Sequence, residues 1–310
     1  MIKNQQYISL SIATIFAFLF LVFFTYSGNA QTLYSCESPR GAPLLHTIDP
    51  NTGATLTTTP ITLDGVQLRG CNGLAKDPST GVCWIILTPP NSGGPGSEPG
   101  PRLLATLDPI TGVASEIGNT GQAIAGIAFD RFGDTLYGLT GNADGGAIPT
   151  IFTLSKLDGS PTFFKELVGT DAGEAIGFNP NDGLIYRSTG FNDLNGTQNF
   201  GSINPNNKVF TKITLSGDTA EYREQLGLTH QSGNLFLSSQ RIEPALHSVT
   251  TGGVVSFIGF MDHEAKGLAF DCGVADFTGI PTMSEWGLIV MAGVLGLLGL
   301  LAIRRKKAAL

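Results

Sequence analysis

The fold is decided by the stretch Gly126-Ile127-Ala128-Phe129-Asp130, which continues through a glycine-bearing turn into Thr135-Leu136-Tyr137. An apolar run, a turn with Asp and Gly, and a second apolar run with an aromatic residue predict a β-hairpin. The pattern occurs three more times, as Gly73-Leu74-Ala75-Lys76-Asp77-Pro78 into Val82-Cys83-Trp84-Ile85, as Ile176-Gly177-Phe178-Asn179-Pro180 into Leu184-Ile185-Tyr186, and as Leu226-Gly227-Leu228-Thr229 into Asn234-Leu235-Phe236. A hairpin that recurs along the chain indicates a repeat architecture.

The pattern is split between the two ends of this region. Gly267-Leu268-Ala269-Phe270-Asp271 is a fifth first half with no second half after it. The missing half stands at the other end, as Thr32-Leu33-Tyr34-Ser35. We therefore expect the last strand to pair with the strand that contains Leu33 and Tyr34, which would close a ring of repeats.

A second hairpin alternates with the first, again five times, at residues 45–53, 104–112, 153–159, 201–207 and 247–253. Each copy is a strand, a tight turn that contains Asp, Asn, Pro or Gly, and a return strand rich in Thr, Val and Ile. Two hairpins per repeat give four strands. A four-stranded unit that recurs about every 50 residues is the sequence sign of a β-propeller.

We therefore predict an all-β fold over residues 31–273, a β-propeller of five four-stranded blades closed by pairing of the N- and C-terminal strands. The first hairpin resembles the blade repeats of a broad class of propellers, and this resemblance concerns architecture and not activity. A β-sandwich or a row of immunoglobulin-like modules is the competing interpretation. Neither requires hairpins that recur in register along the whole region with half a unit at each end.

The C-terminal part reads Ile280-Pro281-Thr282-Met283-Ser284-Glu285-Trp286-Gly287, then an apolar run over 288–303, then Arg304-Arg305-Lys306-Lys307. The apolar run predicts a transmembrane helix that crosses a bilayer when tilted or thinned, with the basic residues kept in the cytoplasm. Residues 280–307 resemble the IPTL-CTERM sorting signal of Gram-negative bacteria, whose core reads IPTLSEWG. Met283 in place of Leu is the only difference from that core.

This resemblance implies that an exosortase-family sorting enzyme handles the tail. It also implies a precursor held transiently in the inner membrane, and a product delivered to the cell surface or the extracellular matrix. A plain C-terminal membrane anchor is the alternative. Residues 274–279 form a short spacer between the propeller and the sorting signal.

The N-terminal residues 1–30 have the features of a signal peptide. Lys3 precedes an apolar stretch from Ile8 to Phe24, and Gly28-Asn29-Ala30 supplies the small residues that a signal peptidase reads. We expect cleavage after Ala30 and export through the inner membrane, and an uncleaved N-terminal anchor is the alternative. Export places the protein where disulfides form.

The charge of the exported part excludes one class of partner. The chain has 18 basic and 25 acidic residues, a formal net charge of −7. Lys3 and the four cations at 304–307 lie in the targeting segments, so the exported part is more acidic than the whole chain. A negative field repels nucleic acid and anionic lipid, so we expect no nucleic-acid partner.

The sequence contains no motif typical of a metalloprotease, a serine hydrolase or a nucleotide-binding loop, and its four histidines fall at unrelated places in the repeats. We therefore predict no catalytic residues, no cofactor and no metal. Asp262-His263-Glu264, before the last strand, is the candidate for a ligand site. Residues 192–196 offer calcium-type oxygen ligands without the closing Glu. The turn acids should accept backbone hydrogen bonds, and they are Asp49, Asp77, Asp108, Asp130, Asp158 and Asp271.

Four cysteines allow three pairings, and they are Cys36, Cys71, Cys83 and Cys272. Cys71 and Cys83 stand four residues out of register in their hairpin, about 13 Å along the strand, beyond the ~7 Å that a disulfide tolerates between Cα atoms. Alignment on the repeats places Cys36 with Cys71 and Cys83 with Cys272, and these are the two bridges that we predict.

These observations predict an exported surface or matrix protein with a non-enzymatic binding, adhesion or structural role, and with a glycan or matrix ligand as its partner. The alternative is a secreted hydrolase or lyase that acts on glycans through carboxylates at the channel mouth. Two or three acids about 5 to 10 Å apart on converging loops would favour the enzyme. A channel lined by backbone and small side chains would favour the binding protein.

Overall fold

The computed structural model describes residues 31–37, 42–89, 102–141, 148–167, 173–189, 200–218, 224–240, 243–273 and Leu295. The predicted signal peptide, the spacer, the sorting motif, the calcium-type loop at 192–196 and, Leu295 apart, the predicted transmembrane helix lie outside these residues. Within the described part, no helix is long and apolar enough to cross a membrane.

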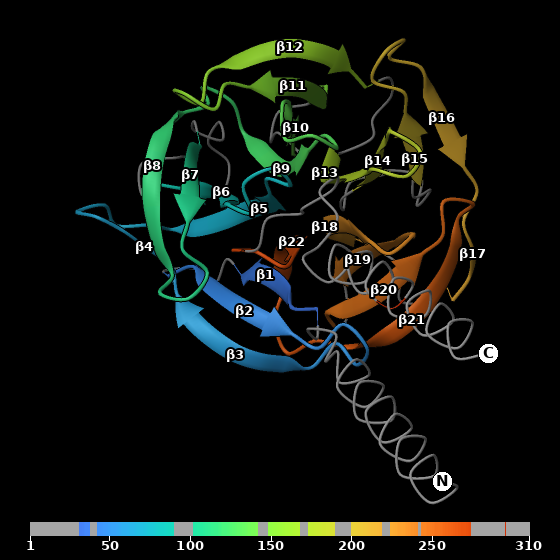
Figure 1. Cartoon of the computed structure of the whole chain (residues 1–310), viewed down its shortest axis with the longest axis horizontal. Helices are drawn as coiled ribbons and strands as arrows, with labels where there is room; N and C mark the ends of the chain where they lie inside the picture. Colours follow the sequence, from blue (N-terminus) through green and yellow to red (C-terminus); the bar gives the residue numbers. More distant parts are fainter. Residues whose placement is uncertain are drawn as a thin grey trace, which may run out of the picture.

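The described residues form five sheets, each built on four antiparallel strands, arranged as blades around a central axis (Figure 1). The closing blade has the order β22 (Ala265–Phe270), β1 (Leu33–Glu37), β2 (Leu44–Ile48) and β3 (Thr55–Pro60). The second blade contains β5 (Gly70–Lys76), β6 (Cys83–Thr88), β7 (Leu103–Leu107) and β8 (Val113–Asn119), with the short β4 (Thr62–Leu63) parallel to β8.

The other three blades repeat this order from the axis outwards. The third contains β9 (Ile124–Phe129), β10 (Leu136–Thr140), β11 (Thr150–Leu154) and β12 (Pro161–Glu166). The fourth contains β13 (Gly173–Asn179), β14 (Leu184–Thr189), β15 (Phe200–Ile203) and β16 (Phe210–Ile213). The fifth contains β18 (Glu224–Gln231), β19 (Asn234–Gln240), β20 (Ala245–Val249) and β21 (Val254–Phe260), with β17 (Ser216–Gly217) parallel to β21.

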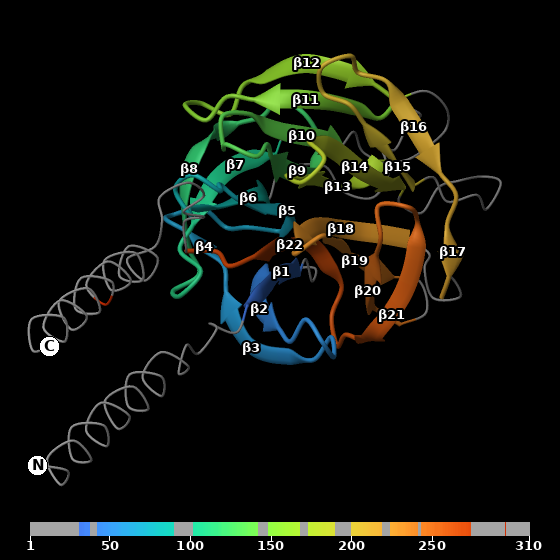
Figure 2. The same ribbon diagram turned by 45° about the vertical axis from the view of Figure 1, so that its right-hand side comes forward.

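The two ends of the propeller meet in the closing blade, as the split repeat predicts. β1 pairs with β22 in the register Leu33 opposite Phe270 and Tyr34 opposite Ala269, and the two strands lie side by side in both views (Figures 1 and 2). Just beyond them, the Asp271 backbone N–H donates to the Thr32 carbonyl at 2.8 Å. The all-β fold, the five blades and the closure are thereby confirmed, and the β-sandwich interpretation is wrong.

The core consists of five apolar clusters, one between each pair of neighbouring blades. Between the second and third blades, for example, Trp84 and Ile86 pack with Ile127 and Leu136. A middle strand is therefore covered on both faces, which is why β6 is buried over five successive residues. The outer strand β8 is covered on one face, and only Ala114 of its seven residues is fully buried.

Glycine allows the inner strands to approach one another at the axis. A Cβ atom on Gly267 of β22 would lie 2.4 Å from the backbone nitrogen of Leu74 in β5, and one on Gly126 of β9 would lie 2.5 Å from the carbonyl oxygen of Glu174 in β13. No side chain fits at such distances from backbone. Glycine is thus a packing requirement at Gly126 and Gly267, whereas the fourth blade has Ala175 at this repeat position.

Five of the six turn acids accept a hydrogen bond from the backbone N–H two residues further on, as the sequence predicts, and Asp271 accepts one from the opposite end of the propeller. Asp49 accepts from Asn51 N at 2.9 Å, and Asp77 from Ser79 N at 2.9 Å. The equivalent bonds run to Asp108 from Ile110, to Asp130 from Phe132 and to Asp158 from Ser160. Asp271 instead accepts from the N–H of Thr32 at 2.9 Å, which joins the two ends of the propeller. These carboxylates stabilise the turns that connect the strands.

Of the two predicted disulfide bonds, one is present in the structure. Cys83 in β6 and Cys272 after β22 form a disulfide, with Cα atoms 5.2 Å apart, so the closing blade is linked covalently to the second. The predicted bridge between Cys36 and Cys71 is wrong, because both are thiols in this structure. The Cys71 thiol donates to the carbonyl of Glu37 at 3.0 Å. Burial, followed by the hydrogen bond with Cys36, raises the pKa of Cys71.

Candidate functional site

A cavity opens at the axis, where the C-terminal ends of β5, β9, β13, β18 and β22 converge. This cavity, which we call the wide mouth, has a volume of about 250 Å³. Its floor includes Leu74, Ile127, Leu228 and Leu268, the same repeat position in four of the five inner strands. All four are also buried in the clusters between blades, so packing holds the floor rigidly.

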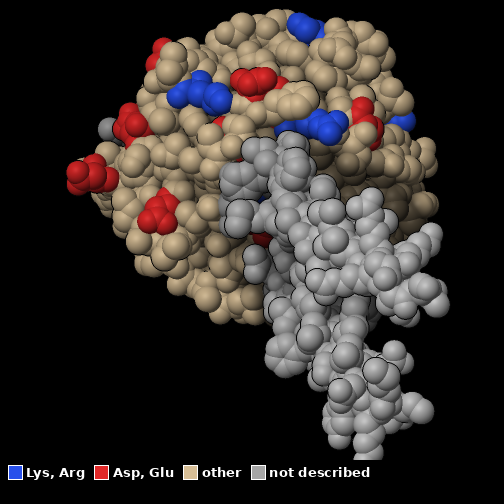
Figure 3. Space-filling view, viewed as in Figure 1, with Lys and Arg blue, Asp and Glu red and all other residues tan. Residues whose placement is uncertain are grey.

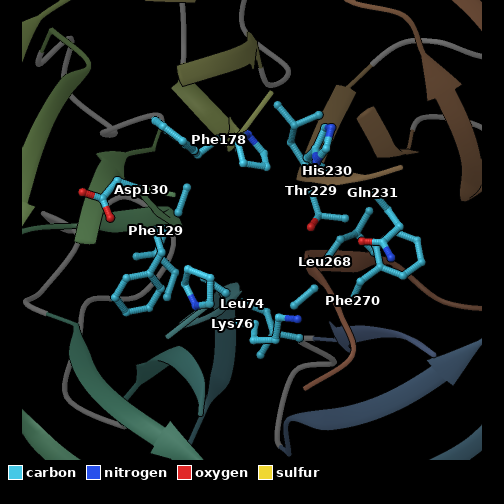
Figure 4. Close-up of a pocket in the computed structure, with 18 of the residues that line it drawn as sticks. Leu74, Lys76, Phe129, Asp130, Phe178, Thr229, His230, Gln231, Leu268 and Phe270 are labelled. Atoms are coloured by element: carbon cyan, nitrogen blue, oxygen red, sulfur yellow. The ribbon is translucent and has the colours of Figure 1, made fainter. Parts of the chain in front are cut away.

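Polar side chains surround this floor (Figure 4). They include Lys76, Arg131, Asn181, Thr229, His230 and Gln231. Lys76 and His230 occupy the repeat position at which the third, fourth and closing blades have Phe129, Phe178 and Phe270. This departure from the repeat is the sequence signal that could have located the site.

The polar rim is arranged around His230. Asn181 Nδ2 lies 3.5 Å from His230 Nε2. Burial lowers the pKa of His230, and the nearby Asp182 opposes this shift in part. The imidazole is therefore neutral at neutral pH and can both donate and accept a hydrogen bond. In Figure 4 the labelled side chains encircle an open centre, towards which the oxygen of Thr229 points.

Asp130 is the one carboxylate among the described residues that line the wide mouth. It accepts hydrogen bonds from the backbone N–H groups of Phe132 at 3.2 Å and Asp134 at 2.9 Å. Both bonds are to Oδ1, so this oxygen is engaged in the turn of Asp130 itself. General acid and base catalysis of glycoside cleavage needs two carboxyl groups that face each other across the scissile bond. The described lining of the wide mouth does not provide such a pair.

A smaller cavity of about 80 Å³, the narrow mouth, lies at the N-terminal ends of the same inner strands. The residues around it include Asn72, Arg102, Glu174, Leu226 and Lys266. Glu174 is the single carboxylate in this described lining, so this end of the channel also lacks a carboxylate pair.

Away from both mouths, Ser35, His263 and Asp262 form a chain of hydrogen bonds in the order of a serine-hydrolase triad. Ser35 Oγ lies 2.7 Å from His263 Nε2, and His263 Nδ1 lies 2.8 Å from Asp262 Oδ1. Their burial is the reverse of what catalysis needs. Ser35 is fully buried between β2 and β22, whereas the Asp262 side chain is 70 % exposed. A nucleophile has to reach its substrate, so this Ser is not placed to act as one.

A second histidine completes this network within the closing blade. The rings of His46 and His263 stack with centroids 3.8 Å apart. His46 contacts Thr58 Oγ1 at 2.9 Å and Glu37 Oε2 at 3.0 Å. Burial and the neighbouring His263 lower the pKa of His46, although Glu37 raises it in part. The network therefore joins β1, β2 and β3 to the segment that precedes β22.

The predicted ligand candidate at residues 262–264 thus serves this internal network. The Asp262 carboxylate also accepts a hydrogen bond from Thr55 Oγ1, which together with His263 lowers the pKa of Asp262. Glu264 lies 4.0 Å from Lys266 Nζ. None of the three residues lines either mouth. Sequence reasoning found His263 but missed Ser35 and His46, because no local pattern connects residues so far apart in the chain.

The surface carries charges of both signs, and the described side chains show no cluster of metal ligands. On the face seen in Figure 3, basic side chains are interspersed with acidic ones and form no continuous basic stripe. Among the described residues, no group of three or more His, Cys, Asp or Glu side chains is arranged to hold a metal ion. The absence of a cofactor and a metal stays a prediction.

Comparison with protein families matches residues 278–305 to the IPTL-CTERM motif. The match confirms the resemblance seen in the tail. It implies an exported, surface-associated protein that a sorting enzyme processes. A search of the curated proteins finds no match to this sequence.

Several solved structures resemble the propeller at low sequence identity. One is the nidogen/laminin complex, with 11 % identity, a TM-score of 0.48, and coverage of 78 % of this chain and 98 % of that one. A protein of unknown function from Bacteroides caccae has 12 % identity, a TM-score of 0.47, and coverage of 78 % and 99 %. Another from Bacteroides thetaiotaomicron has 12 % identity, a TM-score of 0.42, and coverage of 74 % and 64 %. At these values the likeness carries no inference about ligand or activity.

Proposed function

We propose that this chain is an exported surface or matrix protein of a Gram-negative bacterium whose propeller binds a ligand at the wide mouth without chemical turnover. The observation that carries the proposal is the combination of a rigid apolar floor with a ring of polar side chains. Binding sites for small molecules have this construction, because apolar contact supplies affinity and a few placed polar groups supply orientation. The sorting tail would deliver this site to the outside of the cell.

The shape and chemistry of the mouth favour a single sugar ring as the bound group. Its volume of about 250 Å³ is below the ~300 to 1,000 Å³ that is typical of sites for drug-sized ligands. A sugar ring presents an apolar face, which suits the partly buried ring of Phe178 in the lining, and hydroxyl groups at its edge. Thr229, His230 and Gln231 are positioned around that edge and can donate to or accept from hydroxyls.

Two observations favour a binding protein over the alternative hydrolase or lyase. Each mouth has a single carboxylate in its described lining, Asp130 in one and Glu174 in the other, and the Asp130 carboxylate already accepts two backbone hydrogen bonds. In addition, the serine of the triad-like network is fully buried. Hydrolysis would need either a pair of carboxyl groups or an accessible nucleophile, and the described residues of these sites provide neither.

The tail fits the same role. Pro281 fixes φ and disfavours a helical conformation at Ile280, so the motif is suited to bind as an extended peptide in the cleft of an exosortase-family enzyme. The basic residues at 304–307 favour a cytoplasmic C-terminus while the motif is at the outer face of the inner membrane. Cleavage there would release the propeller to the surface or the matrix.

A glycan array probed with the full chain tests the proposal, and we expect selective binding of at least one glycan. The variant Thr229→Val keeps the shape of the side chain and removes its hydroxyl. Because one hydrogen bond contributes about 1 kcal/mol, the affinity for the bound glycan should fall about fivefold. Thr211→Val, at an exposed position of β16, is the matched control and should bind like the unmodified chain.

Two outcomes would contradict the proposal. A uniformly negative array, or equal binding by the two threonine variants, would show that the wide mouth is not a glycan site. Release of reducing sugar from a bound glycan by the purified chain would favour the hydrolase alternative instead.

A further inference from the structure

All five inner strands carry a β-bulge near the N-terminal end, at nearly the same place. In four of them the extra residue is the one before the glycine that starts the repeat pattern, or before Ala175, which takes the place of this glycine in the fourth blade. These extra residues are Ala125, Glu174, Leu226 and Lys266. In β5 the extra residue is Gly73 itself, and Asn72 precedes it. A bulge leaves its extra residue outside the ladder and re-aims the side chain.

The bulges direct these side chains to one place. Asn72, Ala125, Glu174, Leu226 and Lys266 all line the narrow mouth, one from each blade. Without a bulge, the side chains of a regularly paired strand point to the two faces of the sheet, and these residues would then face the neighbouring blades. The narrow mouth is therefore built by a feature that the five blades share, and only the residue types differ between them. Glu174, Lys266 and Asn72 make it polar.

Arg102, in the segment before β7, adds a second cation to the same cavity. Its Nη1 donates to Thr88 Oγ1 at 3.0 Å, and Asn72 Nδ2 donates to the same oxygen at 3.0 Å, so Thr88 orients both side chains. Arg102 Nε is buried and has no hydrogen-bond partner among the described residues. A buried donor without a partner is costly, which makes this N–H group available to a ligand.

The charges of the described residues that line the cavity do not balance. Arg102 and Lys266 are two cations, whereas Glu174 is the single anion in the described lining. The Glu264 carboxylate lies 4.0 Å from Lys266 Nζ, at the limit of an ion pair, and its side chain is 44 % exposed. Solvent screens such a pair, so Glu264 offsets the charge of Lys266 only in part. Burial raises the pKa of Glu174, and Lys266 and Arg102 oppose that shift. Excess positive charge in a poorly solvated space favours a bound anion.

We propose that the narrow mouth binds the carboxylate group of a small organic monoanion, with Lys266 and Arg102 as the groups that hold it. A monoanion neutralises the single excess charge, whereas a dianion such as sulfate would leave an excess negative charge beside Glu174. A carboxylate also has two oxygens, one for the ammonium of Lys266 and one for Arg102 Nε. The volume of about 80 Å³ limits the enclosed part to a group of this size.

Titration of the full chain with sodium acetate tests the proposal, with the acetate methyl signal followed by nuclear magnetic resonance at constant ionic strength. Lys266→Met should weaken acetate binding about tenfold, because one cation of the pair is lost. Glu174→Gln should strengthen it at least threefold, because the carboxylate that repels the ligand is removed. Lys212→Met, on the exposed outer strand β16, is the matched control and should bind acetate like the unmodified chain.

The opposite sign in either variant would overturn the proposal. If Glu174→Gln abolished binding, the cavity would be a site for a cation or an ammonium group. Acetamide, the neutral analogue, should not compete, and sulfate should compete less well than acetate. Equal competition by either compound would contradict a carboxylate site. Glu174→Gln keeps the test decisive even if Lys266→Met fails to fold.

Two further arms of the titration distinguish the sources of the carboxylate. If galacturonate or oligogalacturonate binds at least tenfold more tightly than acetate, and Lys266→Met weakens that binding too, the source is the acidic residue of a glycan. If acetate and glycolate bind as tightly as the sugar acids, the source is a small free acid. Both outcomes support the proposed chemistry.

Discussion

At the scale of the residue, His247 shows how burial sets a property that the sequence does not display. It lies in β20, fully buried, with the ring of Phe257 at 5.7 Å between centroids. Burial lowers its pKa to about 4, and the opposing effect of Asp218 is smaller. A histidine that is neutral in the folded state and protonated near pH 6.5 when unfolded links the stability of the fold to pH.

The folded-state pKa of His247 is below the unfolded value, so the unfolded chain takes up the proton first as pH falls. The stabilisation is complete above about pH 6.5 and is lost as the pH approaches 4. This loss corresponds to about 3 kcal/mol of unfolding free energy. His247→Gln should reduce the loss seen in urea unfolding between pH 7 and pH 4.5. An equal loss in both proteins would show that His247 does not titrate on unfolding.

At the scale of the element, the inner strands combine close packing against their neighbours with a break in the sheet pairing. The repeat glycine allows close approach between neighbouring strands, and the bulge beside it opens the sheet pairing. In β22 these are the successive residues Lys266 and Gly267. The same short stretch of the repeat therefore packs the ring and supplies the lining of the narrow mouth.

Gly267→Ala should destabilise the propeller by about 3 kcal/mol, because its Cβ atom would lie 2.4 Å from the backbone nitrogen of Leu74, which cannot move aside. Gly252→Ala is the matched control, since its Cβ atom would meet nothing closer than 3.8 Å. The control should change the unfolding free energy by less than about 0.5 kcal/mol. Equal urea midpoints for the two variants would disprove the packing argument.

At the scale of the whole molecule, the ring is closed in two ways. The β1–β22 pairing joins the ends by backbone hydrogen bonds, and the Cys83–Cys272 disulfide joins the C-terminal end to the second blade. The two cysteines are 189 residues apart in the chain, so the disulfide removes much of the freedom of the unfolded state.

Replacing Cys83 and Cys272 together with Ala should lower the unfolding free energy by about 5 kcal/mol, as expected for a closed loop of this length. The measurement is urea unfolding of the variant and of the unmodified chain, both without reductant. Adding reductant should bring the unmodified chain close to the variant and leave the variant unchanged. A variant as stable as the oxidised chain would mean that the β1–β22 pairing alone holds the ring closed.

The sequence by itself determined the architecture of this protein. Apolar runs and turn residues specify each hairpin locally, and the half-repeats that begin at Thr32 and Gly267 specify closure without any knowledge of distant contacts. The turn role of Asp130 and its equivalents follows from the same local chemistry. The disulfide between Cys83 and Cys272 could be predicted because alignment of the repeats places both at one level of neighbouring blades.

Only the tertiary structure decided which side chains meet. Ser35 contacts His263 across 228 positions of the chain, and the Cys71 thiol donates to the Glu37 carbonyl and not into a disulfide with Cys36. The convergence of Glu174, Lys266 and Arg102 likewise depends on bulges and on the radius of the closed ring. A repeat pattern specifies each strand from its own residues, whereas these contacts depend on the exact placement of one blade against another, which forms only when the ring closes.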